Sequence, residues 1–186
     1  MMLVLFTKLV FAQTVVGKYT AMGFENNIEA SIKKGDLKVW VATPGEENTM
    51  FKIDGEYDLN RFIVQLKECK EKYIEWSNVA KSNNVTTYAK KIDISFPNVE
   101  IWWKGSKWFS SYKRNFFRPL FFVTEDGTAT FIVNEEATDW DNEFIDTDFF
   151  FILGSTKDFD NLINALNPEK IKKALTQNEN IDDLFK

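Results

Sequence analysis

One stretch, residues 51–69, constrains the fold more than any other part of the chain. It reads FKIDGEYDLNRFIVQLKEC, a short alternating strand that passes through Gly55 into a helical pattern. Behind Asp58, apolar residues recur at steps of three and four, which is the spacing of one face of an α-helix. These residues are Leu59, Phe62, Ile63, Leu66, Cys69, Tyr73, Trp76 and Ala80. We predict that Asp58 caps this helix and that Ser82-Asn83-Asn84 ends it.

The strand-to-helix pattern returns near the end of the chain. Residues 151–167 read FILGSTKDFDNLINALN, in which Asp158 takes the place of Asp58. One interpretation is an internal duplication of a strand–strand–strand–helix unit, with halves at residues 14–84 and 85–177. The alternative is that any strand leading into an amphipathic helix gives this pattern.

Short alternating strands joined by turn residues fill most of the remaining sequence. Lys34-Gly35-Asp36 and Glu125-Asp126-Gly127-Thr128 are typical of β-hairpins, and Gly17 suggests a bulge in the first strand. Strands joined this way favour an antiparallel sheet. The sequence therefore predicts an α+β fold, in which a mostly antiparallel sheet carries the long central helix and the C-terminal helices on one face.

The domain organisation follows from the same patterns. Residues 14–177 are expected to form a single domain, with C-terminal helices at residues 158–166 and 168–175. Pro168 is expected at the first turn of the second of these helices. Residues 178–186 are expected to be a loose tail.

Composition excludes several kinds of chemistry. The chain has no histidine and one cysteine, which removes Ser-His-Asp catalysis, His-ligated metals and intrachain disulfides. Cys69 lies on the apolar face of the central helix, so we predict a buried and inert thiol. The net charge of −5 offers no basic field for nucleic acid, and no glycine-rich phosphate loop occurs. We therefore expect no nucleic-acid partner and no cofactor.

The amino terminus carries a localisation signal of mixed quality. Residues 1–13 read MMLVLFTKLVFAQ and resemble the end of a secretory signal peptide, with cleavage after Ala12. This predicts a secreted or periplasmic protein. Lys8 interrupts the apolar run and a basic leading region is missing, so a buried first strand of a cytoplasmic protein is the alternative. No other stretch approaches the roughly 20 apolar residues of a membrane span.

An aromatic block around residues 102–117 is the first candidate binding site. Trp102 and Trp103 are neighbours on one strand, so their side chains must face opposite sides of the sheet. If Trp103 is in the core, Trp102 faces out, where it can stack on a sugar ring or anchor a protein. If a helix covers that face as well, the block is ordinary core. The candidate ligand-binding residues are Trp102, Trp108, Tyr112, Arg114 and Arg118. The two arginines would give this site a positive charge.

A second candidate site is acidic. Residues 134–148 are expected to form a polar loop, and Asp139, Asp141 and Glu143 are candidate ligands for Ca²⁺. The EF-hand pattern fails here, because the position that requires glycine is Phe144. A solvated loop is the simpler interpretation. The same carboxylates also suggest a pair for glycoside hydrolysis.

These observations leave two functional hypotheses. The favoured one is a small exported, non-enzymatic binding protein that contacts a protein or a glycan through an aromatic sheet face. The alternative is a glycoside hydrolase-like enzyme that uses carboxylates of residues 134–148. An open aromatic patch would favour the first hypothesis, whereas a cleft with two convergent carboxylates would favour the second.

Overall fold

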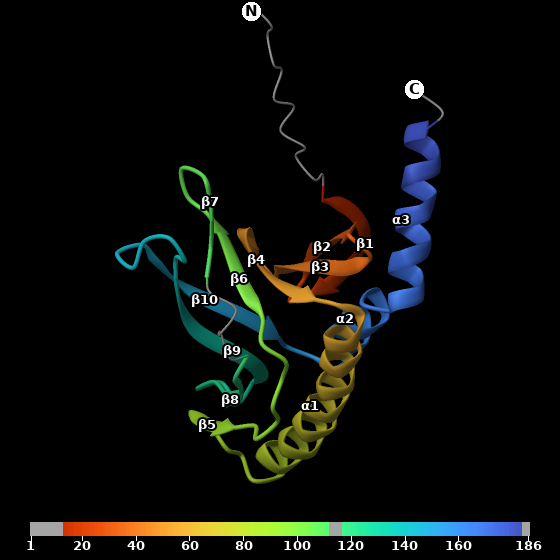
Figure 1. Cartoon of the computed structure of the whole chain (residues 1–186). Helices are drawn as coiled ribbons and strands as arrows, with labels where there is room; N and C mark the ends of the chain where they lie inside the picture. The colour runs from red at the N-terminus through yellow and green to blue at the C-terminus, as the bar shows by residue number, and fades with distance from the viewer. Residues whose placement is uncertain (1–12, 112–116, 184–186) are drawn as a thin grey trace, which may run out of the picture.

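The computed structural model describes residues 13–111 and 117–183, whose strands form two antiparallel sheets (Figure 1). Sheet A has the strand order β1 (Thr14–Ala21), β2 (Phe24–Lys33), β3 (Asp36–Thr43), β4 (Glu46–Asp54), β6 (Glu100–Lys104) and β7 (Trp108–Ser110). Sheet B has the strand order β10 (Asp146–Leu153), β9 (Ala129–Thr138), β8 (Pro119–Val123) and β5 (Tyr88–Lys91). The predicted α+β class with antiparallel strands is confirmed, and the strands divide between two sheets.

Three helices complete the described part of the fold: α1 (Glu56–Ser82), α2 (Thr156–Ala165) and α3 (Pro168–Asp183). The long helix α1 ends where the sequence predicts, and it packs against β3 and β4 of sheet A and β8 and β9 of sheet B. Both α2 and α3 pack against β1, at the edge of sheet A. No helix in the described part of the chain is long and apolar enough to span a membrane.

The core lies where the two sheets and α1 meet. Phe51 of β4 is fully buried at this junction. Its ring centre lies 5.3 Å from that of Phe62 on α1, 5.2 Å from that of Phe117, and 5.4 Å from that of Phe151 on β10. The strand that the sequence placed at the centre of the fold therefore joins sheet A, sheet B and the long helix.

The predicted cap of α1 is wrong. The helix begins at Glu56, directly after Gly55, and no side chain caps it. Gly55 has φ 87° and ψ 150°, a conformation that glycine adopts without the clash of a Cβ, so the backbone itself turns from strand to helix. Asp58 is in the first turn, where it faces Arg61 at 3.6 Å.

The expected role of Asp158 is also wrong, because Ser155 caps α2. The Ser155 hydroxyl accepts a hydrogen bond from the backbone N–H of Asp158 at 3.2 Å. The Asp158 carboxylate in turn accepts from the N–H of Gly154 at 2.9 Å. This reciprocal pattern resembles a capping box, in which two orphan N–H groups at a helix start are satisfied together. Asp58 and Asp158 are thus not equivalent, and the internal duplication stays a prediction.

The expected acidic loop at residues 134–148 is largely a β-hairpin. Strand β9 continues to Thr138 and β10 begins at Asp146, so only residues 139–145 connect them. Along both strands, polar side chains are exposed at alternate positions while Ala137 and Phe149 are buried. A strand with one solvated face accepts carboxylates at every second position, and this made the segment look like a loop.

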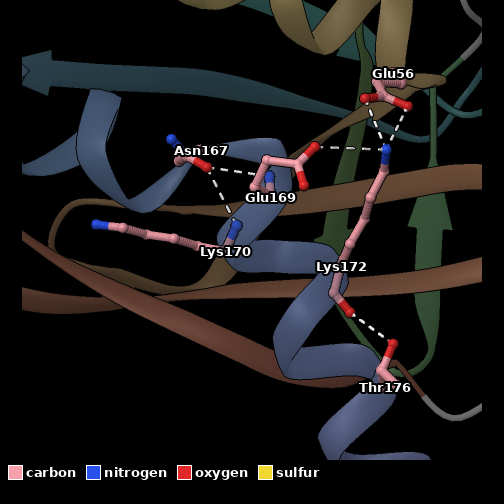
Figure 2. Close-up of polar contacts among 6 residues, drawn as sticks. All are labelled: Glu56, Asn167, Glu169, Lys170, Lys172 and Thr176. Carbon is pink, nitrogen blue, oxygen red and sulfur yellow. Dashed lines mark hydrogen bonds and ion pairs between the residues drawn. The ribbon is translucent and has the colours of Figure 1, made fainter.

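The C-terminal segment is more ordered than expected, since α3 extends through Asp183. Figure 2 shows how this helix begins and how it is attached. Asn167 accepts hydrogen bonds from the N–H groups of Glu169 and Lys170, at 3.0 and 3.1 Å. The Lys172 ammonium lies 2.8 Å from the Glu56 carboxylate, which raises the pKa of Lys172 and links α3 to the first turn of α1.

Other expected elements differ in extent. Strand β5 ends at Lys91, although the alternation of polar and apolar residues in the sequence continues to Phe96. The burial alternation persists beyond it, because Ile92 and Phe96 are buried. The pairing of β1 with β2 shifts register between Val15 and Gly17, where a bulge was expected. The signal peptide prediction concerns residues 1–12, which lie outside the described residues.

Candidate functional site

Trp102 and Trp103 lie on opposite sides of β6, as their spacing predicts. Trp103 is buried in the core with Val99 and Ile101, and its ring stacks on that of Phe109 at 5.8 Å. Trp102 is half-buried on the other side. We call that side the outer face of sheet A, because the alternate residues of the same strands belong to the core.

Cross-strand register shows which residues share the outer face. One row across β2, β3, β4 and β6 is formed by Glu29, Trp40, Lys52 and Glu100. The neighbouring row across β3, β4, β6 and β7 is formed by Ala42, Met50, Trp102 and Ser110. Trp108 is paired with Lys104 and lies diagonally across from Trp102. Three tryptophans, Trp40, Trp102 and Trp108, therefore lie on this one face.

The three indoles have different surroundings. Trp40 is 6 % exposed, and its ring meets that of Trp102 edge to face, with centres 6.3 Å apart. In the amide orientation that satisfies both neighbours, Gln13 accepts from Trp40 Nε1 at 3.2 Å and donates to Glu29 at 2.8 Å. Trp108 is 42 % exposed. Trp40 thus supports Trp102 from the side, while Trp108 presents its ring to solvent.

The indole N–H of Trp102 is the exception. Its Nε1 atom is buried and has no hydrogen-bond partner among the described residues. A buried donor without an acceptor costs roughly 1–3 kcal/mol, so native structures rarely retain one without a compensating role. The outer face therefore has an unused donor beside its aromatic rings.

A buried lysine lies beside Trp40 and Trp102. Lys52 is 6 % exposed, and its ammonium forms an ion pair with Glu100 and lies 3.6 Å from Asp54. The same ammonium is 5.7 Å from the centre of the Trp102 ring. A buried cation needs such partners because removal from water is costly. The lysine and its two carboxylates thus form a charged group next to the half-buried indole.

Glu29 lies on β2, at the end of the row that contains Trp40, Lys52 and Glu100, and the pKa of its carboxyl group is perturbed. Partial burial raises its pKa above the ordinary value for glutamate. The folded protein therefore holds this proton more tightly than the unfolded chain does. It follows that Glu29 lowers stability as the pH rises from its unfolded pKa through its raised folded pKa.

Replacing Glu29 with glutamine should reduce this pH dependence. We expect the E29Q variant to lose less unfolding free energy than the unchanged protein between about pH 4 and about pH 7. Urea denaturation at a series of pH values measures this difference, with exposed Glu143→Gln as the control. Identical pH profiles for E29Q and the unchanged protein would show that Glu29 is not penalised by burial.

The structure brings together only part of the predicted binding set. Trp102 and Trp108 share the outer face of sheet A, whereas Arg118 is exposed directly before β8 of sheet B. Tyr112 and Arg114 lie outside the described residues. Sequence reasoning missed Trp40 and Lys52, which alternate with the core residues of β3 and β4. The alternation itself was the available signal, since it places both side chains opposite the core.

The predicted calcium ligands lie at the tip of the β9–β10 hairpin. Asp141 and Glu143 are exposed, and Asp139 accepts a hydrogen bond from the N–H of Ser110 at 3.4 Å. The N–H of Trp140 donates to the carbonyl of Ser110 at 2.9 Å, which places this tip beside β7. Within the described ranges, no group of three or more acidic or cysteine side chains is arranged to hold a metal ion. The calcium site therefore stays a prediction.

Cys69 is fully buried, as its position on α1 predicts. Burial, with a smaller contribution from the Glu68 carboxylate, raises the pKa of its thiol. A thiol held in the neutral form is a poor nucleophile. We therefore do not include Cys69 in a candidate site.

Comparisons with protein-family models, with curated proteins and with solved structures find no match to this chain. Any statement on function therefore depends on the chemistry of the chain's own residues. Among the sites described above, the outer face of sheet A combines aromatic rings, an unpaired donor and fixed charges.

Proposed function

We propose that this protein is an exported, non-enzymatic binding protein that binds a glycan on the outer face of sheet A. The export part of the proposal depends on the apolar residues 1–13 of the sequence. The observation that supports glycan binding is the shared face of Trp102 and Trp108, on the side of sheet A opposite the core.

The chemistry of this face suits a sugar. The C–H bonds on one side of a sugar ring are attracted to the electron-rich face of an indole. The partly exposed carboxylates of Glu29 and Glu100 lie in the neighbouring row, where they can accept hydrogen bonds from sugar hydroxyl groups. A glycan oxygen that reaches Trp102 Nε1 after a small side-chain adjustment would also satisfy the unpaired donor.

Contacts with neighbouring side chains favour a Trp102 side chain that is ordered before a ligand binds. The Trp40 ring contacts the Trp102 ring, and the Lys52–Glu100 ion pair joins a side chain of β4 to a side chain of β6. Side chains that are already ordered lose little conformational entropy when a ligand binds. The outer face therefore resembles a preformed platform.

Loss of the Trp102 ring should weaken glycan binding strongly. The purified protein is first applied to a glycan array, and the dissociation constant of the best glycan is then measured by calorimetry. We expect the W102A variant to bind this glycan at least about fivefold more weakly, because stacking on an indole contributes about 1 kcal/mol or more. The control is Tyr57→Ala, which removes an exposed aromatic ring from α1.

Two results would contradict the proposal. One is that no glycan on the array is retained, in which case a protein partner becomes the alternative occupant of the face. The other is that a glycan binds equally well to W102A and to the unchanged protein. Matching thermal midpoints for W102A and Y57A would exclude unfolding as the cause of a lost signal.

A further inference from the structure

A second concave site lies where the C-terminal end of α1 meets sheet B. In Figure 1 this end of the helix lies near β5, at the bottom of the view. The site is a cavity of 320 Å³. Its lining includes Trp76 and Ala80 of α1, Val85 of the connection between α1 and β5, Tyr88 and Lys90 of β5, and Phe121 of β8.

The interior of this cavity is apolar and aromatic. Phe121 and Ala80 are buried, and the Trp76 ring meets the Phe121 ring edge to face at 5.7 Å. Trp76 is partly buried and packs against the main core, to which Phe121 belongs. The two aromatic walls, Trp76 and Phe121, therefore come from a helix and a strand of the folded domain.

Lys90 is the only basic residue among the described residues that line this cavity. The Lys90 ammonium is 4.2 Å from the centre of the Trp76 ring. No carboxylate among the described residues lies within ion-pair distance of it. A cation over an aromatic ring is partly stabilised, but it keeps the capacity to bind an anion. The cavity thus combines an apolar interior with one positive charge that has no counter-ion in the described chain.

We propose that this cavity binds a small amphipathic carboxylate. The apolar tail lies against Trp76 and Phe121, and the carboxylate pairs with Lys90. Ligand cavities in proteins have volumes of about 300–1,000 Å³, so this one accepts a compact ligand such as a medium-chain fatty acid. The proposal is independent of the glycan platform, because none of its residues lies on sheet A.

The test compares two probes with the same tail. Decanoate carries the carboxylate, and decanol replaces it with a neutral hydroxyl group. We expect saturable binding of decanoate in calorimetry, and at least about tenfold weaker binding of decanol because the charged pair with Lys90 is lost. In nitrogen-15 spectra, decanoate should shift the indole signal of Trp76 and leave that of Trp102 unchanged.

Variants identify the residues responsible. The K90M variant keeps an apolar side chain and removes the charge, so it should bind decanoate about as weakly as decanol. The V79E variant adds a negative charge at an exposed position in the cavity lining and should also weaken decanoate binding. The control K67M removes an exposed lysine elsewhere on α1, and W102A removes the glycan platform. Both should bind decanoate normally.

The proposal is overturned if decanoate shows no saturable binding to the unchanged protein. It is also overturned if K90M binds decanoate as tightly as K67M does. Failure of decanoate binding with retained glycan binding would reject this cavity alone, and the reverse result would reject the glycan platform alone.

Discussion

Replacing Phe51 by alanine is expected to lower the unfolding free energy by about 3–5 kcal/mol. Phe51 is fully buried, and its ring contacts rings from α1, from β10 and from the segment before β8. The large effect follows from this position, because a cavity here removes contacts between sheet A, sheet B and the long helix together. Domains of this size have a total stability of about 5–15 kcal/mol, so F51A should be close to unfolding.

Urea denaturation of F51A measures this loss, and Phe150→Ala is the matched control. Phe150 is also a phenylalanine of the sheets, but it is 40 % exposed on β10. We expect F150A to lose no more than about 1 kcal/mol, because little buried area is removed. Similar losses for F51A and F150A would show that the two sheets do not share a core through Phe51.

Replacing Lys52 by methionine is expected to cost about 3 kcal/mol, the second largest effect. The ammonium of Lys52 is the partner of Glu100 and lies near Asp54 and the Trp102 ring. Its removal leaves a nearly buried carboxylate on Glu100 without its cation. The exposed pair of Lys18 and Glu25 gives the control, since K18M should change stability by less than about 1 kcal/mol.

A double-mutant cycle separates the ion pair from simple packing. If the penalty of K52M comes from the uncompensated Glu100 carboxylate, the added substitution E100Q should recover part of the loss. The measured quantity is the difference between the double variant and the sum of the single variants. Strictly additive losses would contradict a direct energetic coupling between Lys52 and Glu100.

Features of short range could be predicted from the sequence. The spacing of apolar residues located α1 and its buried face, and the alternation around Trp102 and Trp103 assigned them to opposite sides of β6. The Asp126-Gly127 turn was also recognisable, and Gly127 adopts φ 83° in the β8–β9 hairpin. In each case the signal lies within a few neighbouring residues, whose spacing is set by the geometry of one element.

Features that depend on distant contacts could not be predicted in this way. Asp58 looks like a cap, but Gly55 turns the chain one helical turn earlier, so the side chain has no capping role. The acidic residues 134–148 look like a loop, yet β10 pairs with β9 through most of this segment. In both places the backbone conformation or the partner strand outweighs the local residue preference.

In the candidate site too, residues close together in the sequence could be predicted, whereas residues brought in by other strands could not. The sequence pointed to Trp102 and Trp108, because both belong to the aromatic block. It did not point to Trp40 or Lys52, since they join Trp102 only through the order of β3, β4 and β6 in sheet A. Two strands that are adjacent in the sheet, β4 and β6, are separated in sequence by the whole of α1. The acidic residues at the hairpin tip remain exposed, which gives no support to the enzyme hypothesis.

The most direct test of the glycan platform is a nitrogen-15 titration of the tryptophan indole N–H signals. The chain has six tryptophans, so these signals are few enough to assign by single substitutions. When the glycan selected on the array is added, we expect the signals of Trp102 and Trp108 to shift, while that of Trp76 stays in place. Glycan binding that leaves the Trp102 and Trp108 signals unchanged would contradict the assignment of function to the outer face of sheet A.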